Sequence, residues 1–471
     1  MEIFFNIYNI TNIILTLLSV VVGLYCAYRI VKKKKRVLLS CLGVILSLVV
    51  MTLCIRKLYE YYDLWFKIVR VPQLSYISEL SLSPKQCRED FKEITQIVND
   101  NYQEIANRKK IDLQKLNAEY AEEVLKVENA QQYGQVLLRY FASLKNMHTY
   151  PFFSFYSSNL SLVTRNDSVW IARDRKNLRQ KDLIVAIDGV ATADYMKEKL
   201  KYTFGSTYQT RKRLAAVGVL SSYADTCKRV TILRGDSVFE IVIPLYKNKE
   251  DWLETFQRGA KDCTKVSSQG MNQQVSLLLA KALKRLDNIG YIRIPHFSAG
   301  SVEYFCSQID SAFNCPYLIL NLQKNQGGVR RNVLNIASYL VSEPVTMGDM
   351  TIKPDTSRCY KGKLLVLTDE FTSSGGEILT ALLKGQPNVT VIGRRTGGDC
   401  GSMAFNFKTS HGIEFKLATE VPYLLPDGVT WSEGEGISPD IEVEEILPWE
   451  DKKDAFEIAL NWIEKDKLKN T

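Results

Sequence analysis

The chain has 471 residues, of which 46% are hydrophobic and 24% are charged. This length predicts two to four structural units, and the ordinary globular composition excludes a disordered or fibrous protein. The net charge is +9, but residues 1–57 hold eight basic side chains and one acidic one, which leaves +2 for the other 414 residues. Because this remainder lacks a basic excess, we expect no nucleic-acid partner.

The N-terminus has the pattern of a two-helix transmembrane hairpin, expected over residues 1–66. Val37 to Ile55 are nineteen consecutive uncharged residues, enough to cross a bilayer as a helix, and Ile13 to Tyr28 are also apolar. The basic cluster 32–36 lies between the two runs, whereas a signal peptide carries its basic residues first. The alternative, a pair of buried core helices, would have to bury five consecutive cations.

Charge also predicts the orientation of this hairpin. Since Lys and Arg are retained on the cytoplasmic side, the loop 32–36 should face the cytoplasm and both ends of the hairpin should point outward. We therefore expect a protein anchored in the inner or plasma membrane by two spans. The chain after about residue 57 should lie on the extracytoplasmic side.

The next two parts of the chain differ in their apolar pattern. Residues 84–150 have apolar side chains at helical spacing, and Ser83 followed by Pro84 is a typical helix start, so we expect a helical bundle. Residues 155–247 instead contain short apolar runs, such as Leu183–Ile187, between turn residues. They predict a β-rich domain, followed by a hydrophilic linker.

The third part, residues 276–446, alternates apolar runs with helical stretches, which predicts an α/β core with a largely buried sheet. Residues 447–471 should form a terminal amphipathic helix, centred on 449–465. The predicted strands of the core are Ile289–Ile294, Tyr317–Leu322, Leu364–Thr368 and Val389–Ile392, and its predicted helices cover 300–313, 329–342 and 375–384.

Two loops at the ends of predicted strands have the residues of an acyl-transfer site. In KLLVLTDEFTSSGGEILTALLK, Ser373 or Ser374 falls between a strand and a helix, where free backbone N–H groups could stabilise an oxyanion. In NLQKNQGG, Gly327 and Gly328 allow close backbone approach. The alternatives are a helix-capping serine and a plain loop.

A general base has few candidates, because the chain holds only three histidines: His148, His296 and His411. Structural or solvated histidines are more common than catalytic ones. Spacing alone therefore selects none of the three as the base.

Seven segments, in this order, resemble the C-terminal-processing (tail-specific) serine protease family, specifically its tricorn-core-like branch. No single motif is specific, but the ordered set is, and it spans about residues 85 to 465. The matching segments are Leu144–Thr149, Asp182–Gly189 (DLIVAIDG), Ile289–Phe297, Asn321–Gly328, Ser374–Glu377, Val391–Gly398 and Glu433–Ile441.

The resemblance implies a crotonase-like α/β protease core, with the helical bundle before it and a PDZ-like insert in the β-rich part. Carried over by position, Ser374 is the nucleophile, His148 the base and Glu433 its orienting partner. The backbone N–H of Gly375, with one from Gly327 or Gly328, would form the oxyanion hole. No metal and no organic cofactor is implied.

The chain also departs from the family's pattern. Asp399 occupies the position of the lysine in the Ser–Lys dyad of one branch, and Met147 replaces the serine that precedes the histidine in tricorn-like members. Asn321 and Gln323 replace an acidic residue and an arginine. We expect a membrane-anchored serine endopeptidase that cleaves peptides or unfolded tails, and the alternative is an inactive relative that binds peptides or other ligands as a scaffold.

Overall fold

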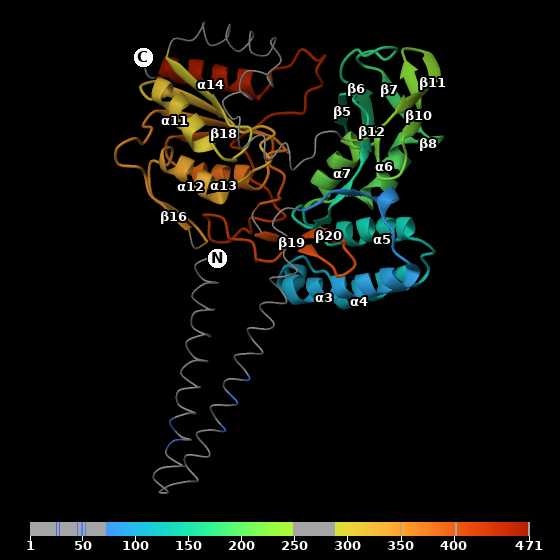
Figure 1. The fold of residues 1–471 in the computed structure, drawn as a ribbon. Helices are drawn as coiled ribbons and strands as arrows, with labels where there is room; N and C mark the ends of the chain where they lie inside the picture. The colour runs from blue at the N-terminus through green and yellow to red at the C-terminus, as the bar shows by residue number, and fades with distance from the viewer. Residues whose placement is uncertain are drawn as a thin grey trace. The chain divides into compact units, whose positions relative to one another are not determined.

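The computed structural model describes residues 72–247 and 288–469 except 349, 401 and 402, together with five isolated positions nearer the N-terminus. Within this part of the chain, 72–405 and 410–469 belong to one compact unit (Figure 1). The predicted hairpin lies almost wholly outside the described residues, as does most of the predicted linker. No helix among the residues described has both the length and the apolar run needed to span a bilayer.

A helical bundle follows two short elements at the start of the continuous described chain. Ser83 begins its first helix as predicted, because its hydroxyl accepts the backbone N–H of Gln86 while the Gln86 side chain accepts the N–H of Ser83. The buried hydroxyl of Tyr102 donates to the carbonyl of Leu144 at 2.8 Å, which fixes the end of the third helix. The helices are α3 (Pro84–Arg108), α4 (Leu113–Leu125) and α5 (Ala130–Ser143).

The β-rich part forms an antiparallel sheet of order β11-β10-β7-β6-β5, with β8 paired to β7. Alternate strand residues and two helices enclose its apolar core. The elements are β5 (Leu162–Arg165), β6 (Ser168–Ile171), β7 (Leu183–Ile187), β8 (Val190–Ala191), α6 (Thr192–Leu200), α7 (Tyr208–Val217), β10 (Cys227–Arg234) and β11 (Ser237–Pro244).

The α/β core is a parallel sheet of order β13-β14-β17-β18-β21. Three helices pack on one face and α14 covers the other, so both faces are buried and the strands are continuous apolar runs, as predicted (Figure 1). The elements are β13 (Ile289–Arg293), α11 (Ser301–Ala312), β14 (Tyr317–Asn321), α12 (Arg330–Ser338), β17 (Lys363–Thr368), α13 (Gly375–Leu383), β18 (Val389–Gly393), β21 (Ile441–Glu442) and α14 (Ala455–Lys469).

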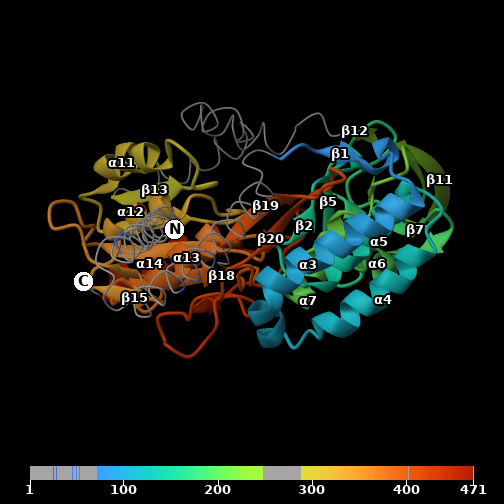
Figure 2. The same cartoon turned by 60° about the horizontal axis from the view of Figure 1, so that its bottom comes forward.

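Short strands make up the remaining elements of the described chain. β2 pairs with β20, which places Tyr150 opposite Lys416, so the segment after the helical bundle lies against the C-terminal third of the chain (Figure 2). The remaining elements are β1 (Ser75–Tyr76), η1 (Ile77–Glu79), β2 (Tyr150–Pro151), β3 (Phe153–Ser154), β4 (Tyr156–Ser157), β9 (Ser221–Ser222), β12 (Tyr246–Lys247), β15 (Val345–Met347), β16 (Met350–Ile352), β19 (Ala404–Lys408) and β20 (Glu414–Ala418).

Two helices differ from their predicted bounds. The stretch predicted over 329–342 is helical only to Ser338, because the chain turns into the core and buries Leu340 and Val341 there. The terminal helix begins at Ala455 instead of 449. Asp454 accepts the N–H of Glu457 at 2.9 Å, and this N-cap sets the start that hydrophobic periodicity could not locate.

Candidate active site

Ser374 lies at the sharp turn between β17 and α13, with φ 51° and ψ −119°. A residue with a side chain rarely adopts this conformation, which costs on the order of 1–3 kcal/mol and persists only where the surroundings impose it. The turn projects Ser374 at the N-terminus of a buried helix. A strained turn of this type is the geometry that exposes a nucleophile in other hydrolases.

The carboxylate of Glu377 holds this turn from beneath. It is fully buried and accepts the N–H of Ser374 at 3.2 Å, the N–H groups of Gly398 and Asp399 at 2.8 Å each, and the hydroxyl of Thr396 at 2.6 Å. Burial and the nearby Asp399 raise the pKa of Glu377 to about 8. Glu377 thus joins the nucleophile turn to the loop after β18, a function that the motif alone did not indicate.

His148 is the histidine that meets the serine. Its Nε2 lies 3.3 Å from Oγ of Ser374, and its backbone N–H donates to Oδ1 of Asn146 at 2.8 Å. Burial, followed by the positive charges of Lys416 and Lys109, lowers the pKa of His148 to about 3. The imidazole is therefore neutral near pH 7, which is the form that can accept a proton.

The other two histidines lie in different surroundings. Nδ1 of His296 is 2.8 Å from the hydroxyl of Ser298, and Nε2 of His411 is 3.2 Å from Glu89 on α3. Neither is hydrogen bonded to Ser374. The structure thus brings together the predicted serine and the predicted histidine of the three candidates.

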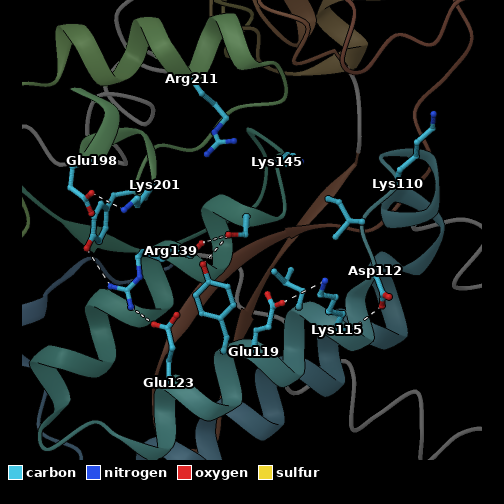
Figure 3. A pocket seen from close by; sticks show the side chains of 15 residues that line it. Lys110, Asp112, Lys115, Glu119, Glu123, Arg139, Lys145, Glu198, Lys201 and Arg211 are labelled. Atoms are coloured by element: carbon cyan, nitrogen blue, oxygen red, sulfur yellow. Dashed lines mark hydrogen bonds and ion pairs between the residues drawn. The ribbon is translucent and has the colours of Figure 1, made fainter. Parts of the chain in front are cut away.

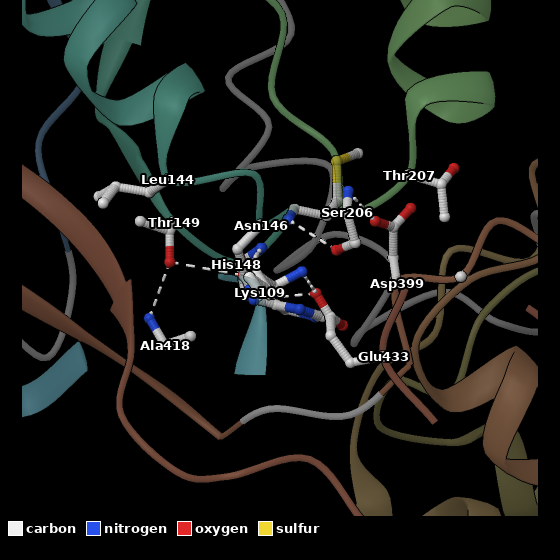
Figure 4. Close-up of polar contacts among 12 residues, drawn as sticks. Lys109, Leu144, Asn146, His148, Thr149, Ser206, Thr207, Asp399, Ala418 and Glu433 are labelled. Carbon is white, nitrogen blue, oxygen red and sulfur yellow. Dashed lines mark hydrogen bonds and ion pairs between the residues drawn. The ribbon is translucent and has the colours of Figure 1, made fainter. Parts of the chain in front are cut away.

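Glu433 is close by, but its observed partners are not the predicted one. Its Oε1 accepts Nζ of Lys109 and Nδ2 of Asn146, each at 3.0 Å (Figure 4). Within the described residues, Oε2 of Glu433 and Nδ1 of His148 are both buried without a hydrogen-bond partner. The predicted contact between Glu433 and His148 is therefore not formed here, because Lys109 and Asn146 hold the carboxylate.

The three glycines predicted to form the oxyanion hole differ in whether their backbone N–H groups already have an acceptor. Gly327 has φ +91°, and an added Cβ would lie 2.5 Å from the nitrogen of Gly375 and 2.6 Å from Cβ of Ser374, so only glycine fits. Its own N–H is engaged, since it donates to Oδ1 of Asn325 at 2.7 Å. In the described part of the chain, the N–H groups of Gly328 and Gly375 have no protein acceptor.

Asp399, at the position of the dyad lysine in the other branch, joins the site to the β-rich part. It is buried, and its Oδ1 accepts the N–H of Ser206 at 2.7 Å. The hydroxyl of Ser206 in turn accepts the N–H of Met147 at 3.2 Å. Burial and the charge of Glu433 raise the pKa of Asp399 to about 7. Sequence reasoning missed Ser206, because no motif surrounds it.

Comparisons with known proteins agree with this geometry. Residues 288–443 match the model of "Peptidase family S41", and residues 165–245 match that of "Bacteroidetes, Peptidase, S41 family, N-terminal domain". A carboxy-terminal-processing protease of Bartonella bacilliformis is 26% identical over 201 residues, which cover 39% of this chain and 45% of the relative. A tricorn protease homolog of Streptomyces coelicolor is 25% identical over 186 residues, which cover 37% and 16%.

A solved structure has the same fold over most of the chain. Mature CPAF complexed with lactacystin matches with a TM-score of 0.61 and 13% identity, over 82% of this chain and 98% of that one. The chain spans less than half the length of the curated relatives it matches. The mixed α/β fold and the Ser–His pair define the class of serine peptidases. Within it, the chain belongs to peptidase family S41, which confirms the predicted family.

Proposed function

We propose that this protein is a serine endopeptidase that cleaves peptides or unfolded protein tails. The observation that carries the proposal is the 3.3 Å contact between Nε2 of His148 and Oγ of Ser374, at a strained turn. In the described part of the chain, two N–H groups near this turn have no protein acceptor: that of Gly375, which follows Ser374, and that of Gly328, which follows the glycine packed against Ser374. A nucleophile, a neutral base and oxyanion donors are what acyl transfer requires.

The reaction proceeds through an acyl-enzyme. As Oγ of Ser374 attacks the scissile carbonyl carbon, Nε2 of His148 takes the hydroxyl proton, and the N–H groups of Gly375 and Gly328 stabilise the oxyanion. Collapse of the tetrahedral intermediate breaks the C–N bond, and His148 passes the proton to the leaving amine. Water then attacks the ester by the same route in reverse, which regenerates Ser374.

Glu433 supports the imidazolium formed in this cycle. In the present arrangement Asn146 links the two residues, since it donates to Oε1 of Glu433 and accepts the backbone N–H of His148; this link positions the chain at His148 and does not reach the imidazole. When substrate closes the site, Oε2 of Glu433 accepts Nδ1–H of His148, since catalytic hydrogen bonds often tighten only in the substrate complex. This step would satisfy the two buried atoms that lack a partner in the described part of the chain.

The proposed location is the extracytoplasmic face of the membrane, with the chain held by the N-terminal hairpin. Support comes from the two apolar runs and from the basic loop between them. Reporter enzymes fused after residue 34 and after residue 70 test the orientation. We expect a periplasm-specific reporter to be active only at 70, and activity only at 34 would invert the topology.

A catalytically silent scaffold is the second candidate. It is favoured by Met147 beside the histidine, by Asn321 and Gln323 in the glycine loop, and by the engagement of Glu433 with Lys109. A PDZ-like insert could bind peptide ends by strand addition without any cleavage.

Hydrolysis by the full chain in detergent separates the two candidates. Cleavage of an unfolded protein by the parent but not by Ser374→Ala would establish the peptidase. Ser373→Ala is the matched control and should retain activity. Cleavage that survives in Ser374→Ala would refute the assignment of the nucleophile. If no variant cleaves and a fluorophosphonate fails to label Ser374, the silent scaffold is the better description.

A further inference from the structure

A large cavity lies between the helical bundle and the two helices of the β-rich part. Its volume is about 780 Å³, within the range of sites that bind small ligands or peptide segments. Side chains from α4, α5, α6 and α7 line it (Figure 3). None of the residues placed in the active site lines this cavity, so its ligand is unassigned.

The carboxylates that line the cavity already have cationic or backbone partners. Glu123 pairs with Arg139, and Glu198 is 2.7 Å from Lys201. The other two carboxylates also have partners: Glu119 lies 4.0 Å from Lys115, and Asp112 caps α4 by accepting the N–H of Lys115.

Among the residues that the structure describes, three cations of the lining have no carboxylate partner. The side chains of Lys110 and Lys145 make no hydrogen bond or ion pair with the described residues. Arg211 reaches into the cavity from α7 and donates to the carbonyl oxygens of Leu200 and Thr203, at 3.0 Å each (Figure 3). Those carbonyls hold its orientation but leave its charge uncompensated. Six cations and four carboxylates line the cavity, so its lining carries a formal net charge of +2.

Two of these cations are adjacent in the chain to the active site. Lys110 directly follows Lys109, which binds Glu433, and Lys145 lies three positions before His148. Apolar and aromatic side chains, including Leu116 and Tyr120, line the same cavity and could contact a peptide chain. Lys145 and the catalytic base thus share one short segment, and Lys110 shares another with the residue that binds Glu433.

We propose that this cavity binds an acidic segment of the peptide substrate, with carboxylates paired to Lys110, Lys145 and Arg211. The inference rests on the proposed peptidase function and adds a substrate class to it, namely peptides with several Asp or Glu residues. Pairing with the three cations favours carboxylate side chains over neutral ones and steers their approach. The cavity would hold this segment while the scissile bond reaches Ser374.

Binding measured on the full-length Ser374→Ala variant tests this proposal without requiring catalysis. A fluorescein-labelled peptide rich in glutamate is compared with the same peptide carrying glutamine, by fluorescence anisotropy. We expect the acidic peptide to bind about tenfold more tightly, with the difference shrinking as salt is added. Equal affinities for the two peptides would refute the proposal.

Paired substitutions locate the binding. Lys110→Gln with Lys145→Gln should remove the preference, whereas Lys110→Arg with Lys145→Arg should keep it. The matched control, Lys353→Gln with Lys361→Gln, removes two exposed lysines of the α/β core that do not line the cavity. A preference that survives the glutamine pair would place acidic binding elsewhere and overturn the assignment.

Two further measurements distinguish a failure of the binding proposal from a failure of the peptidase proposal. Inorganic phosphate at millimolar concentration should displace the acidic peptide only weakly. Full displacement would identify a site for small anions instead of peptide segments. If the parent enzyme hydrolyses nothing while the acidic preference is present, the peptidase proposal fails and the binding site stands.

Discussion

The two halves of the active site differ in how completely their polar atoms are satisfied. On the nucleophile half, the buried carboxylate of Glu377 receives four hydrogen bonds and fixes the turn of Ser374. On the base half, Nδ1 of His148 and Oε2 of Glu433 are buried and lack partners among the described residues. Buried polar atoms without partners are uncommon and costly in folded proteins.

This difference indicates which half of the active site is preorganised before substrate binds. The nucleophile turn is held rigid by one α/β core, whereas the base half joins α3, the end of α5 and the segment that carries Glu433. The part of the site that remains unsatisfied is therefore the pair of atoms on His148 and Glu433, beside the contact of Lys109 with Glu433. The variants below test this division, from the largest expected effect to the smallest.

Removing the base should have the largest effect. For His148→Ala we expect kcat/KM to fall by roughly three decades or more, as for other deletions within a catalytic triad. His296→Ala should remain near the parent, because His296 contacts Ser298 and not Ser374. Steady-state kinetics on a neutral peptide provide the measurement. The opposite pattern would mean that His296 is the base.

A methyl group at Gly327 should break the nucleophile half. Gly327→Ala would push Cβ against Gly375 and Ser374, so we expect at least about a hundredfold loss of kcat/KM from misplaced reacting groups. Gly385→Ala is the matched control, because Gly385 has φ +90° but nothing within 4 Å of an added Cβ. We expect the backbone strain in Gly385→Ala to lower its melting temperature while kcat/KM stays near that of the parent. Equal activity in both variants would remove Gly327 from the site.

Lys109→Met should change the pH dependence more than the maximal rate. Lys109 is one of the charges that lower the pKa of His148, and loss of the cation also leaves Glu433 uncompensated. Both changes favour the imidazolium, so the pKa of His148 rises and the acid limb of kcat/KM against pH moves to higher pH. Lys92→Met, at an exposed position of α3, should leave the profile unchanged. A profile of Lys109→Met that matches the parent would contradict the proposed coupling.

The strain at Ser374 should appear as a small gain in stability when it is released. Ser374→Gly permits φ 51° without strain, whereas Ser374→Ala keeps a side chain there. We expect the glycine variant to be more stable than the alanine variant by about 1 kcal/mol in the free energy of unfolding. Denaturant titrations of both variants measure the difference. A less stable glycine variant would mean that the turn is not strained.

Much of the fold could be predicted because the sheet is buried on both faces. The strand predicted over Tyr317–Leu322 is found at Tyr317–Asn321, since an apolar run bounded by turn residues has few other interpretations. Pairings between distant two-residue strands, such as β2 with β20, could not be predicted. Their register depends on contacts between segments far apart in the sequence and not on local pattern.

The site residues that could be predicted from the sequence are those that lie within the recognised motifs. The order of the seven segments pointed to Ser374 and His148, and the structure places them in contact. The pairing of Lys109 with Glu433 joins positions 324 residues apart and has no motif of its own. Asn146 adjoins a recognised segment, but its contact with Glu433 depends equally on tertiary structure. Local spacing could not indicate either contact.

The distance along the chain between the catalytic partners has a consequence for biosynthesis. His148 and Ser374 are separated by 226 positions, and Asn146 and Glu433 by 287. Contacts of such long range form late, after the segments between them have been made and ordered. Because the chain is made from its N-terminus, a partly synthesised copy would hold His148 before Ser374 exists, which is a base without its nucleophile. Under the proposed mechanism, a copy gains its Ser–His pair only when these distant segments have met, so hydrolysis by a copy would report that its fold is complete.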